Sequence, residues 1–252
     1  MKLALSNSLT TARAPAAAFN PADIANLEVF LHAIPANCWQ DVGMATTPAG
    51  VGDVVKGWKG SFGTTINATE ATSPPTLRAN GLEFDPTELL NLSSAIALGE
   101  SVSAFTLYLG GRIAASVGDY YLPIGHSTTL GSMYHDGTDC YVLDDAAAGS
   151  INNATAAADE DSDTFLWRCA HDGTTTAYHV IPSTYPVLNG SLTFGAITFD
   201  TLGFPAGLGV GMGNIDHRIR LIIIIKRLIV LDSAEDNLIR GWIASNDGGT
   251  LV

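Results

Sequence analysis

The sequence is poor in basic residues. Its 252 residues include only 12 Lys and Arg against 25 Asp and Glu, so the formal net charge at pH 7 is −13. Proteins that bind nucleic acid draw much of their affinity from Lys and Arg contacts to phosphates. The charge therefore argues against nucleic acid as a partner, and against long-range attraction to an anionic cell surface.

Cysteine is also scarce. Cys38, Cys140 and Cys169 are odd in number and far apart, so they form no C-x-x-C motif and no disulfide framework. We expect free, buried thiols in a reducing compartment. His135 lies near Cys140 and His171 near Cys169, but neither pair has the spacing of a four-ligand zinc site. The sequence therefore predicts no bound metal and no cofactor.

Apolar runs are too short to cross a membrane. The clearest, residues 221–225, ends at Lys226 and falls far short of the ~18 residues of a spanning helix. The first residues imitate a signal peptide, but Ser6-Asn7-Ser8 interrupts the apolar stretch before it reaches the ~7–15 residues required. We expect no membrane segment and no cleaved leader, and we interpret residues 1–19 as an extended arm that a partner orders.

Turn-forming residues, by contrast, are abundant. The chain has 26 Gly and 11 Pro, and hydrophobic residues make up 46% of it while charged residues make up only 15%. This balance favours many short strands over solvent-facing helices, which need a charged outer face. A chain of this length can bury a full core as one β domain.

Apolar alternation indicates where the strands lie. Residues 27–32 alternate, and residues 102–113 are partly apolar on both faces, as in the central strand of a sandwich. Residues 164–170 and 176–181 flank Asp172-Gly173, a favoured pair in hairpin turns. Further strands are predicted over residues 54–58, 120–124, 132–135, 140–143, 192–197, 207–212, 219–225 and 228–231.

The end of the chain changes to a helical period. Asp232 is followed three residues later by Glu235, which resembles a capping box. Four apolar residues then recur on one helical face, namely Leu238, Ile239, Trp242 and Ile243. These features predict a helix over about 233–245, packed on the rim of the sheets.

Several segments resemble the concanavalin A-like/laminin-G-like jelly-roll domains of phage structural proteins. Residues 19–31 (FNPADIANLEVFL) are similar to the opening phrase F-x-P-x-x-I-x-x-L-x-L-W-L-D-A, with Phe30 in place of the Trp and His32 in place of the Asp. The other similar segments are residues 55–59, 80–85 and 213–235. The resemblance implies that residues 20–252 form an all-β, two-sheet antiparallel jelly-roll sandwich.

The resemblance also implies a virion protein. We expect a capsid decoration or tail-associated subunit, made in the host cytoplasm, that performs no enzymatic reaction and contacts other virion proteins. Its arm, residues 1–19, would bind a neighbouring subunit of a homo-oligomer. Two alternatives stay open: a carbohydrate-binding receptor-recognition (adhesin) module of the phage tail, with a host glycan as partner, and a glycan hydrolase.

The hydrolase alternative depends on one motif. Glu83, Asp85 and Glu88 fit the E-x-D-x-x-E pattern of jelly-roll β-glucanases, in which two carboxyl groups ~5 Å apart serve a retaining mechanism. Pro86 argues against this interpretation, since proline cannot donate to the ladder of a central strand. We therefore expect a strand that runs into a turn, and no catalytic residues.

A calcium loop is also a weak candidate. Asp159, Asp161 and Asp163 imitate its start, but Thr164 occupies the glycine position and Ala170 the position of the bidentate glutamate. We expect a solvated acidic loop.

Sugar-binding sites stack aromatic rings on sugar rings and direct Asp or Asn at the hydroxyl groups. The candidates for such a site are Trp39, Tyr120, Tyr121, Tyr134 and Tyr185, with Asp119, Asp136 and Asn189 beside them. The sequence does not select among them.

Overall fold

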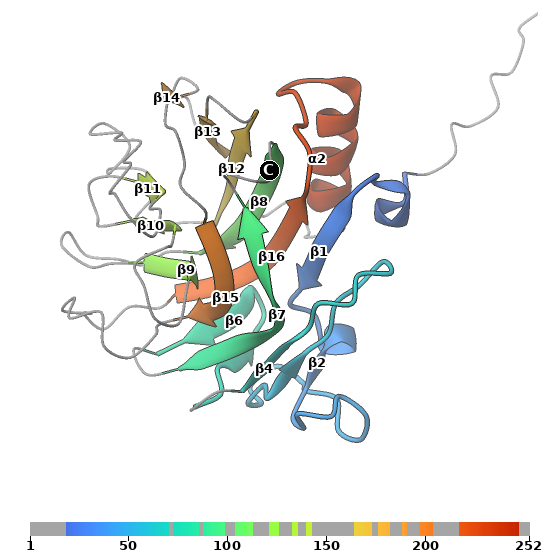
Figure 1. Ribbon diagram of the computed structural model, residues 1–252. Helices are drawn as coiled ribbons and strands as arrows, with labels where there is room; N and C mark the ends of the chain where they lie inside the picture. Colours follow the sequence, from blue (N-terminus) through green and yellow to red (C-terminus); the bar gives the residue numbers. More distant parts are fainter. Residues whose placement is uncertain are drawn as a thin grey trace, which may run out of the picture.

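The structure is a computed structural model, and it describes residues 19–70, 73–85, 88–98, 104–112, 121–125, 133–135, 140–142, 164–172, 176–181, 188–190, 197–203 and 217–246. Within them the chain forms two antiparallel eight-stranded sheets, here named sheet A and sheet B, and a helix α2 over Ala234–Asn246 (Figure 1). The coarse prediction, a two-sheet all-β sandwich with a C-terminal helix, is confirmed.

Sheet A is organised around β16, which pairs with three other strands. The order is β14 (Leu188–Gly190), β13 (Thr176–Ile181), β12 (Thr164–His171), β8 (Phe105–Arg112), β16 (His217–Ile225), β6 (Gly81–Phe84) and β5 (Thr76–Arg78), and β1 (Leu27–His32) also pairs with β16. The two 3-10 helices η1 (Pro21–Asp23) and η2 (Pro35–Asn37) flank β1.

Sheet B is organised around the pair β15–β7. The order is β11 (Cys140–Val142), β10 (Met133–His135), β9 (Tyr121–Gly125), β15 (Ile197–Gly203), β7 (Leu89–Leu98), β4 (Ala68–Glu70), β3 (Gly57–Trp58) and β2 (Cys38–Trp39). Strand β7, which is ten residues long, was not predicted. Its sequence, LLNLSSAIAL, breaks the apolar alternation with two adjacent serines, so the period of two is weak.

The inner faces of the two sheets enclose the main apolar core. On β8, alternation turns Phe105, Leu107 and Leu109 inward, where they join a cluster that includes Trp58 and Phe199 of sheet B. All five side chains are at most 2% exposed. Burying each one contributes about 1.5–3 kcal/mol, so this layer dominates the favourable free energy of folding.

Helix α2 adds a third layer on the outer face of sheet A. Ile239 and Ile243, each 1% exposed, pack with Tyr108, Leu221 and Ile223 in a second cluster. The helix therefore covers the face of the sheet, and its predicted position on the rim is wrong. The physical reason is that the outward-facing side chains in the middle of sheet A, Tyr108 on β8 with Leu221 and Ile223 on β16, are largely apolar and need a cover.

Strand β16 is buried on both faces, which explains its run of consecutive isoleucines. Ile222 and Ile224 point into the inter-sheet core, whereas Leu221, Ile223 and Ile225 point toward α2. All five are at most 1% exposed. A strand between two apolar layers reads as a continuous hydrophobic run, without the alternation of a half-exposed strand.

A buried ion pair joins α2 to sheet A. Arg168 on β12 and Asp236 on α2 are 1% and 0% exposed, and the distance from Arg168 Nε to Asp236 Oδ1 is 2.8 Å. The Tyr108 hydroxyl donates to the same oxygen at 2.6 Å, and Arg168 also donates to the carbonyl of Ile229. The four groups satisfy one another inside the protein.

The protonation of this network follows from its contacts. Burial alone would raise the pKa of Asp236, but the Tyr108 hydrogen bond and the Arg168 charge outweigh burial and hold that pKa below its ordinary value. Burial, first, and the Asp236 charge, second, raise the pKa of Tyr108. Asp236 is therefore ionised, and the phenol stays protonated to donate.

The helix begins one residue later than predicted, with a different cap. Ser233 is the cap, since its Oγ accepts a hydrogen bond from the backbone N–H of Asp236 at 3.2 Å. Asp236 Oδ2 in turn accepts from the backbone N–H of Asp232 at 3.1 Å. The predicted capping pair, Asp232 with Glu235, is wrong because Asp232 has a φ of 58°, and Glu235 pairs with Arg227 instead.

Residues 228–231 do not form the strand that was predicted for them. Ile229 is 1% exposed, and its apolar character reflects packing beneath α2. Side chains satisfy its backbone: its N–H donates to Thr106 Oγ1 at 2.8 Å and its carbonyl accepts from Arg168. These bonds take the place of a sheet ladder.

Several predictions fall outside the described residues. They are the arm up to residue 18, the acidic loop 144–163 and the strand 207–212. Only Ile197 of the predicted strand 192–197 is described, where it starts β15.

Candidate functional site

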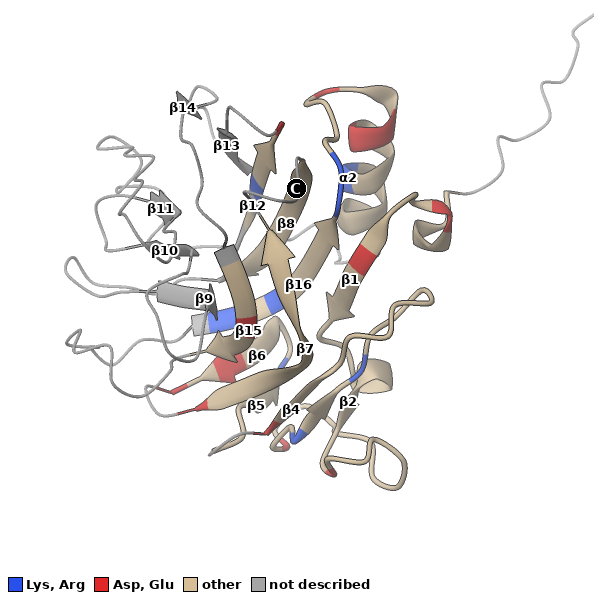
Figure 2. Cartoon of the chain, in the orientation of Figure 1, with Lys and Arg blue, Asp and Glu red and all other residues tan. Residues whose placement is uncertain are grey.

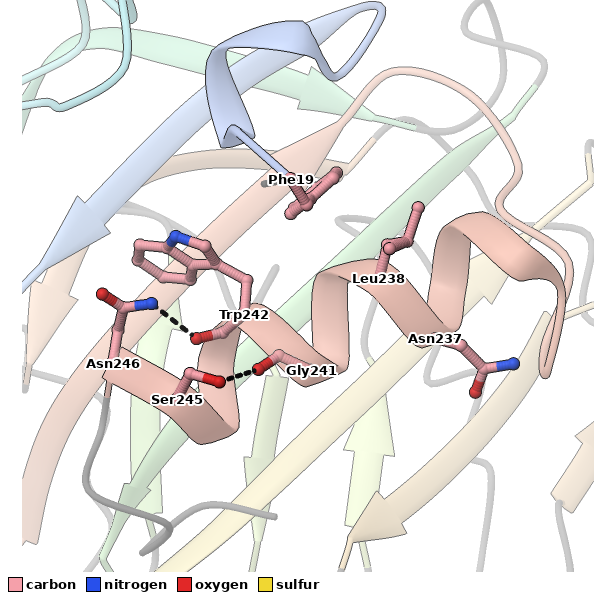
Figure 3. A pocket seen from close by; sticks show the side chains of 7 residues that line it. All are labelled: Phe19, Asn237, Leu238, Gly241, Trp242, Ser245 and Asn246. Atoms are coloured by element: carbon pink, nitrogen blue, oxygen red, sulfur yellow. Dashed lines mark hydrogen bonds between the residues drawn. The ribbon is translucent and has the colours of Figure 1, made fainter. Parts of the chain in front are cut away.

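A pocket of about 480 Å³ lies on the outward face of α2 (Figure 3). It is lined by Phe19, Asn237, Leu238, Gly241, Trp242, Ser245 and Asn246. Six of these residues belong to the helix, and Phe19, just before η1, lies over the helix between Leu238 and Trp242. The volume falls within the ~300–1,000 Å³ typical of small-molecule sites.

The outward face of the helix differs from the predicted one. Asp236, Ile239 and Ile243 form the buried stripe, so Leu238, predicted to be buried with Ile239, is 51% exposed instead. Trp242 is partly buried at the edge between the two faces. The pocket thus combines one exposed apolar side chain, Leu238, with two aromatic side chains, Phe19 and Trp242, that are only partly buried.

Gly241 leaves the centre of this face open. No neighbouring atom lies within 4 Å of the position that a Cβ at residue 241 would occupy, and its φ is not positive. A glycine inside a helix costs about 0.8–1.0 kcal/mol relative to alanine. Neither a positive φ nor close packing accounts for this glycine, and a larger side chain here would project into the open space above the helix.

Aromatic rings fix the orientation of Trp242. Its ring meets Phe30 at 5.1 Å, Phe62 at 5.4 Å and His32 at 5.8 Å between centroids, each in an edge arrangement. Such pairs are worth about 0.5–1.5 kcal/mol each beyond their buried area. The indole is therefore preorganised beside the pocket.

Phe62 reaches Trp242 from a strained turn. Its φ is 54° and that of Gly63 is 83°, while Thr64 N–H donates to the carbonyl of Ser61 at 3.1 Å. Placing the backbone of a bulky residue in the left-handed region costs on the order of 1–3 kcal/mol of folding free energy. The ring contacts of Phe62 with Phe30, at 4.6 Å, and with Trp242 help to offset this cost.

The polar groups of the pocket are uncharged. Ser245 Oγ donates to the carbonyl of Gly241 at 2.8 Å, and Asn246 Nδ2 donates to that of Trp242 at 2.9 Å (Figure 3). Asn237 Nδ2 donates to the carbonyl of Asp232 at 3.0 Å. Ser245 and Asn246 are both exposed, so the Ser245 hydroxyl oxygen and the Asn246 amide oxygen can accept hydrogen bonds, and the second Nδ2 hydrogen of Asn246 can be donated.

The hydrolase motif is placed elsewhere. Glu83 lies on β6 between Leu82 and Phe84, which face the inter-sheet core, so its side chain is on the outer face of sheet A. Arg78 contacts Glu83 Oε1 at 2.6 Å, and Arg218 contacts Oε2 at 3.0 Å. Figure 2 shows the basic segments of β16 beside acidic β6. Both carboxylate oxygens are thus engaged in ion pairs.

Glu88 has a different role from Glu83. Its Oε2 accepts from the backbone N–H of Asp85 at 2.7 Å, which closes the turn after β6. Burial, the largest cause, together with the nearby Asp85 charge raises the pKa of Glu88. The expected strand end that runs into a turn is found here, and Pro86 falls outside the described residues.

The described residues contain no group of three or more His, Cys, Asp or Glu side chains that could hold a metal ion. Cys38 and Cys169 are free and buried, and burial raises the pKa of each thiol to about 12. His135 and Cys140 are register partners on β10 and β11. His171 packs against Phe105, at 5.7 Å between rings. The calcium-loop candidates Asp159, Asp161 and Asp163 lie outside the described residues.

The four sugar-site candidates that the structure describes do not form one cluster, although Tyr121 and Tyr134 lie on the paired strands β9 and β10. Trp39 is on β2 at one edge of sheet B, Tyr121 and Tyr134 are on β9 and β10 toward the opposite edge, and Asn189 is on β14 of sheet A. The other candidates, Asp119, Tyr120, Asp136 and Tyr185, lie outside the described residues.

The pocket itself was not predicted, because Trp242 was assigned to the helix core and Phe19 to the arm. One signal in the sequence could have revealed it. Asn237, Gly241 and Ser245 recur every four residues on one face of the helix, and a glycine in mid-helix is unusual.

Helices long and apolar enough to cross a bilayer are absent from the part of the chain that the structure describes. No protein-family model matches the chain, and no curated protein matches it.

Solved structures do show similarity in fold. Trypanosoma rangeli sialidase in complex with sialic acid matches with a TM-score of 0.50 and 14% identity, over 88% of this chain and 33% of the sialidase chain. A tryptophan-to-alanine mutant of HCR/D matches with a TM-score of 0.53 and 8% identity, over 86% and 52% of the two chains. The binding domain of botulinum neurotoxin DC in complex with SialylT matches with a TM-score of 0.51 and 10% identity, over 89% and 52%.

These likenesses show the fold alone, since all the identities are low. The chain spans about a third of the sialidase chain and about half of each of the other two. The shared fold is a β-sandwich.

Proposed function

We propose that this chain is a concanavalin A-like jelly-roll module that binds a carbohydrate in the pocket on α2. The observation that carries the proposal is the open surface above Gly241, bounded by the preorganised Trp242 and by neutral hydroxyl and amide groups. Two similar structures, a sialidase with sialic acid and a toxin binding domain with SialylT, support a sugar as the class of ligand.

A sugar ring matches these features chemically. It has an apolar face of C–H groups and a rim of hydroxyls, so it packs on an aromatic ring while its edge forms hydrogen bonds. Phe19 and Trp242 provide the rings, and Ser245 and Asn246 provide acceptors for hydroxyl donors. A side chain at residue 241 would occupy the volume that the sugar needs.

The proposal is binding without cleavage. Hydrolysis of a glycosidic bond requires an acid and a carboxylate on either side of it. Carboxylates are absent from the seven residues that line the pocket. Glu83 and Glu88, the carboxylates of the hydrolase motif, are engaged by arginines and by a turn. We expect Glu83→Gln and Glu88→Gln to leave sugar binding unchanged.

The proposal includes a place for the module, on the tail of a phage particle, where it would recognise a host glycan. The location in the virion, the contacts with other virion proteins and the arm of residues 1–19 remain predictions from sequence resemblance. Deleting residues 1–18 tests them: reduced incorporation into particles is expected, and unchanged incorporation contradicts the role of the arm.

Replacing Gly241 with leucine tests the site directly. The side chain fills the pocket, so we expect at least tenfold weaker glycan binding by calorimetry, whereas the free energy of unfolding stays the same or rises by up to about 1 kcal/mol because a helical glycine is removed. The matched control is Ala234→Leu, on an exposed position of the same helix outside the pocket. Full binding by Gly241→Leu contradicts the proposed site.

A further inference from the structure

We infer that the pocket on α2 selects uncharged saccharides and rejects sialylated or otherwise anionic ones. The inference rests on the proposed carbohydrate site and specifies its ligand class. It departs from the ligands of the similar structures, which are sialic acid and SialylT. It comes from the charges on and around the helix.

The lining itself offers no charge to an anionic sugar. Its seven residues comprise two aromatic residues, a leucine, a glycine, two asparagines and a serine. A carboxylate moved from water into such a pocket loses hydration and gains only neutral partners, which is unfavourable. A neutral sugar loses hydroxyl hydration alone, and the acceptors on Ser245 and Asn246 replace it.

The arginines near the helix are already paired with carboxylates. Arg240, one turn from Asn237 and adjacent to Gly241, contacts Asp236 Oδ2 at 2.9 Å and Asp232 Oδ1 at 2.6 Å. Its NH2 group also donates to Asn237 Oδ1 at 2.8 Å. Recruiting Arg240 to a ligand carboxylate would break these bonds and leave Asp236 without one of its partners.

Two other arginines that the structure describes beside the helix are engaged in the same way. Arg227 pairs with both oxygens of Glu235, and Arg168 is buried beneath the helix against Asp236. The whole chain carries a net charge of −13, so its field repels an anion before contact. Local pairing and the overall charge thus favour the same class of ligand.

Matched pairs of glycans test the inference. The full-length protein is titrated with neutral oligosaccharides such as lactose, N-acetyllactosamine and chitobiose, and with sialylated or sulfated forms of the same cores. We expect binding to at least one neutral core, at least tenfold weaker binding to its anionic form, and less than twofold change in the neutral affinity between 50 and 500 mM NaCl, because no ion pair contributes.

Leu238→Arg provides a gain-of-function arm. Residue 238 lines the pocket and is 51% exposed, so the substitution adds a cation at the pocket. Glu235, three residues earlier on the helix, already pairs with Arg227. We expect Leu238→Arg to reduce the ratio of the affinity for the neutral glycan to the affinity for its anionic form by at least threefold. Leu238→Gln, which introduces a polar but uncharged side chain, is the control and should leave the ratio of the two affinities unchanged.

The outcomes separate the inference from the proposed function. If the anionic form of a glycan binds more tightly than its neutral form, and Gly241→Leu abolishes that binding, the inference about charge is wrong but the site is correct. Neutral binding that survives Gly241→Leu would overturn the site. If none of these glycans binds the full-length protein, the inference and the proposed site both fail.

Discussion

Replacing Asp236 with asparagine is expected to lower the free energy of unfolding by about 3–5 kcal/mol. The substitution keeps the shape of the side chain but removes the negative charge that faces Arg168, which is 1% exposed. The guanidinium is then buried without a counter-charge, and the Tyr108 hydroxyl loses a charged acceptor. Urea denaturation, followed by circular dichroism, measures the loss.

A double variant separates the ion pair from simple packing. Arg168→Met together with Asp236→Leu removes both charges and retains apolar volume, so we expect it to recover part of the stability that Asp236→Asn loses. The recovery is incomplete because the Tyr108 hydroxyl and the Ile229 carbonyl lose their partners. A double variant no more stable than Asp236→Asn would contradict this account of the network.

Acid should weaken the attachment of α2 for the same reason. The pKa of Asp236 is lower in the folded protein than its ordinary value near 4. Its contribution to stability is therefore complete above that ordinary value, and it is lost as the pH falls through the lower folded-state pKa. The Asp236→Asn variant should lack this part of the acid dependence.

Two neighbouring isoleucines on β16 should contribute about equally to the free energy of unfolding. Ile222→Ala and Ile223→Ala are each expected to cost about 2–5 kcal/mol, although their side chains point in opposite directions. Ile222 contributes to the inter-sheet core and Ile223 to the layer beneath α2, and both are 0% exposed. The matched measurement is urea denaturation of the two single variants.

Val230→Ala is the control for these substitutions. Val230 follows the strand and is 62% exposed, so truncation should change the free energy of unfolding by no more than about 0.5 kcal/mol. If Ile223→Ala behaves like Val230→Ala, the outer face of sheet A is not covered by the helix, and the three-layer arrangement is wrong.

The elements predicted correctly from sequence are those in which apolar residues recur at the regular spacing of a strand or a helix. Strand β1 lies at residues 27–32 as predicted, and the hairpin of β12 and β13 surrounds Asp172-Gly173. The C-terminal helix is within one residue of its predicted ends. In each case local alternation, turn chemistry or helical spacing determines the element, and tertiary contacts agree with it.

Other elements depend on contacts that no short window contains. Residues 228–231 look like a strand, but Ile229 bonds to Thr106 and Arg168, which lie far away in sequence. The position of α2 depends on the apolar outward-facing side chains of β8 and β16. These can be identified only when the structure shows that β16 is buried on both faces. Apolar composition alone does not distinguish these arrangements.

The candidate site was missed for a related reason. Its parts come from both ends of the described chain, with Phe19 before η1 and Trp242 on α2, so no motif connects them. The resemblance to the jelly-roll fold offered carbohydrate binding, the function proposed above, as an open alternative. It could not identify the residues, because exposure of Leu238 and open space at Gly241 are properties of the packed helix.

The most direct measurement is a crystal structure of the protein with the neutral oligosaccharide that binds best. We predict a sugar ring above Gly241, in contact with the Trp242 indole, with its hydroxyls within hydrogen-bond distance of Ser245 or Asn246. An oligosaccharide bound elsewhere on the sandwich, with the surface above Gly241 empty, would contradict the central claim that this helix face is the carbohydrate site.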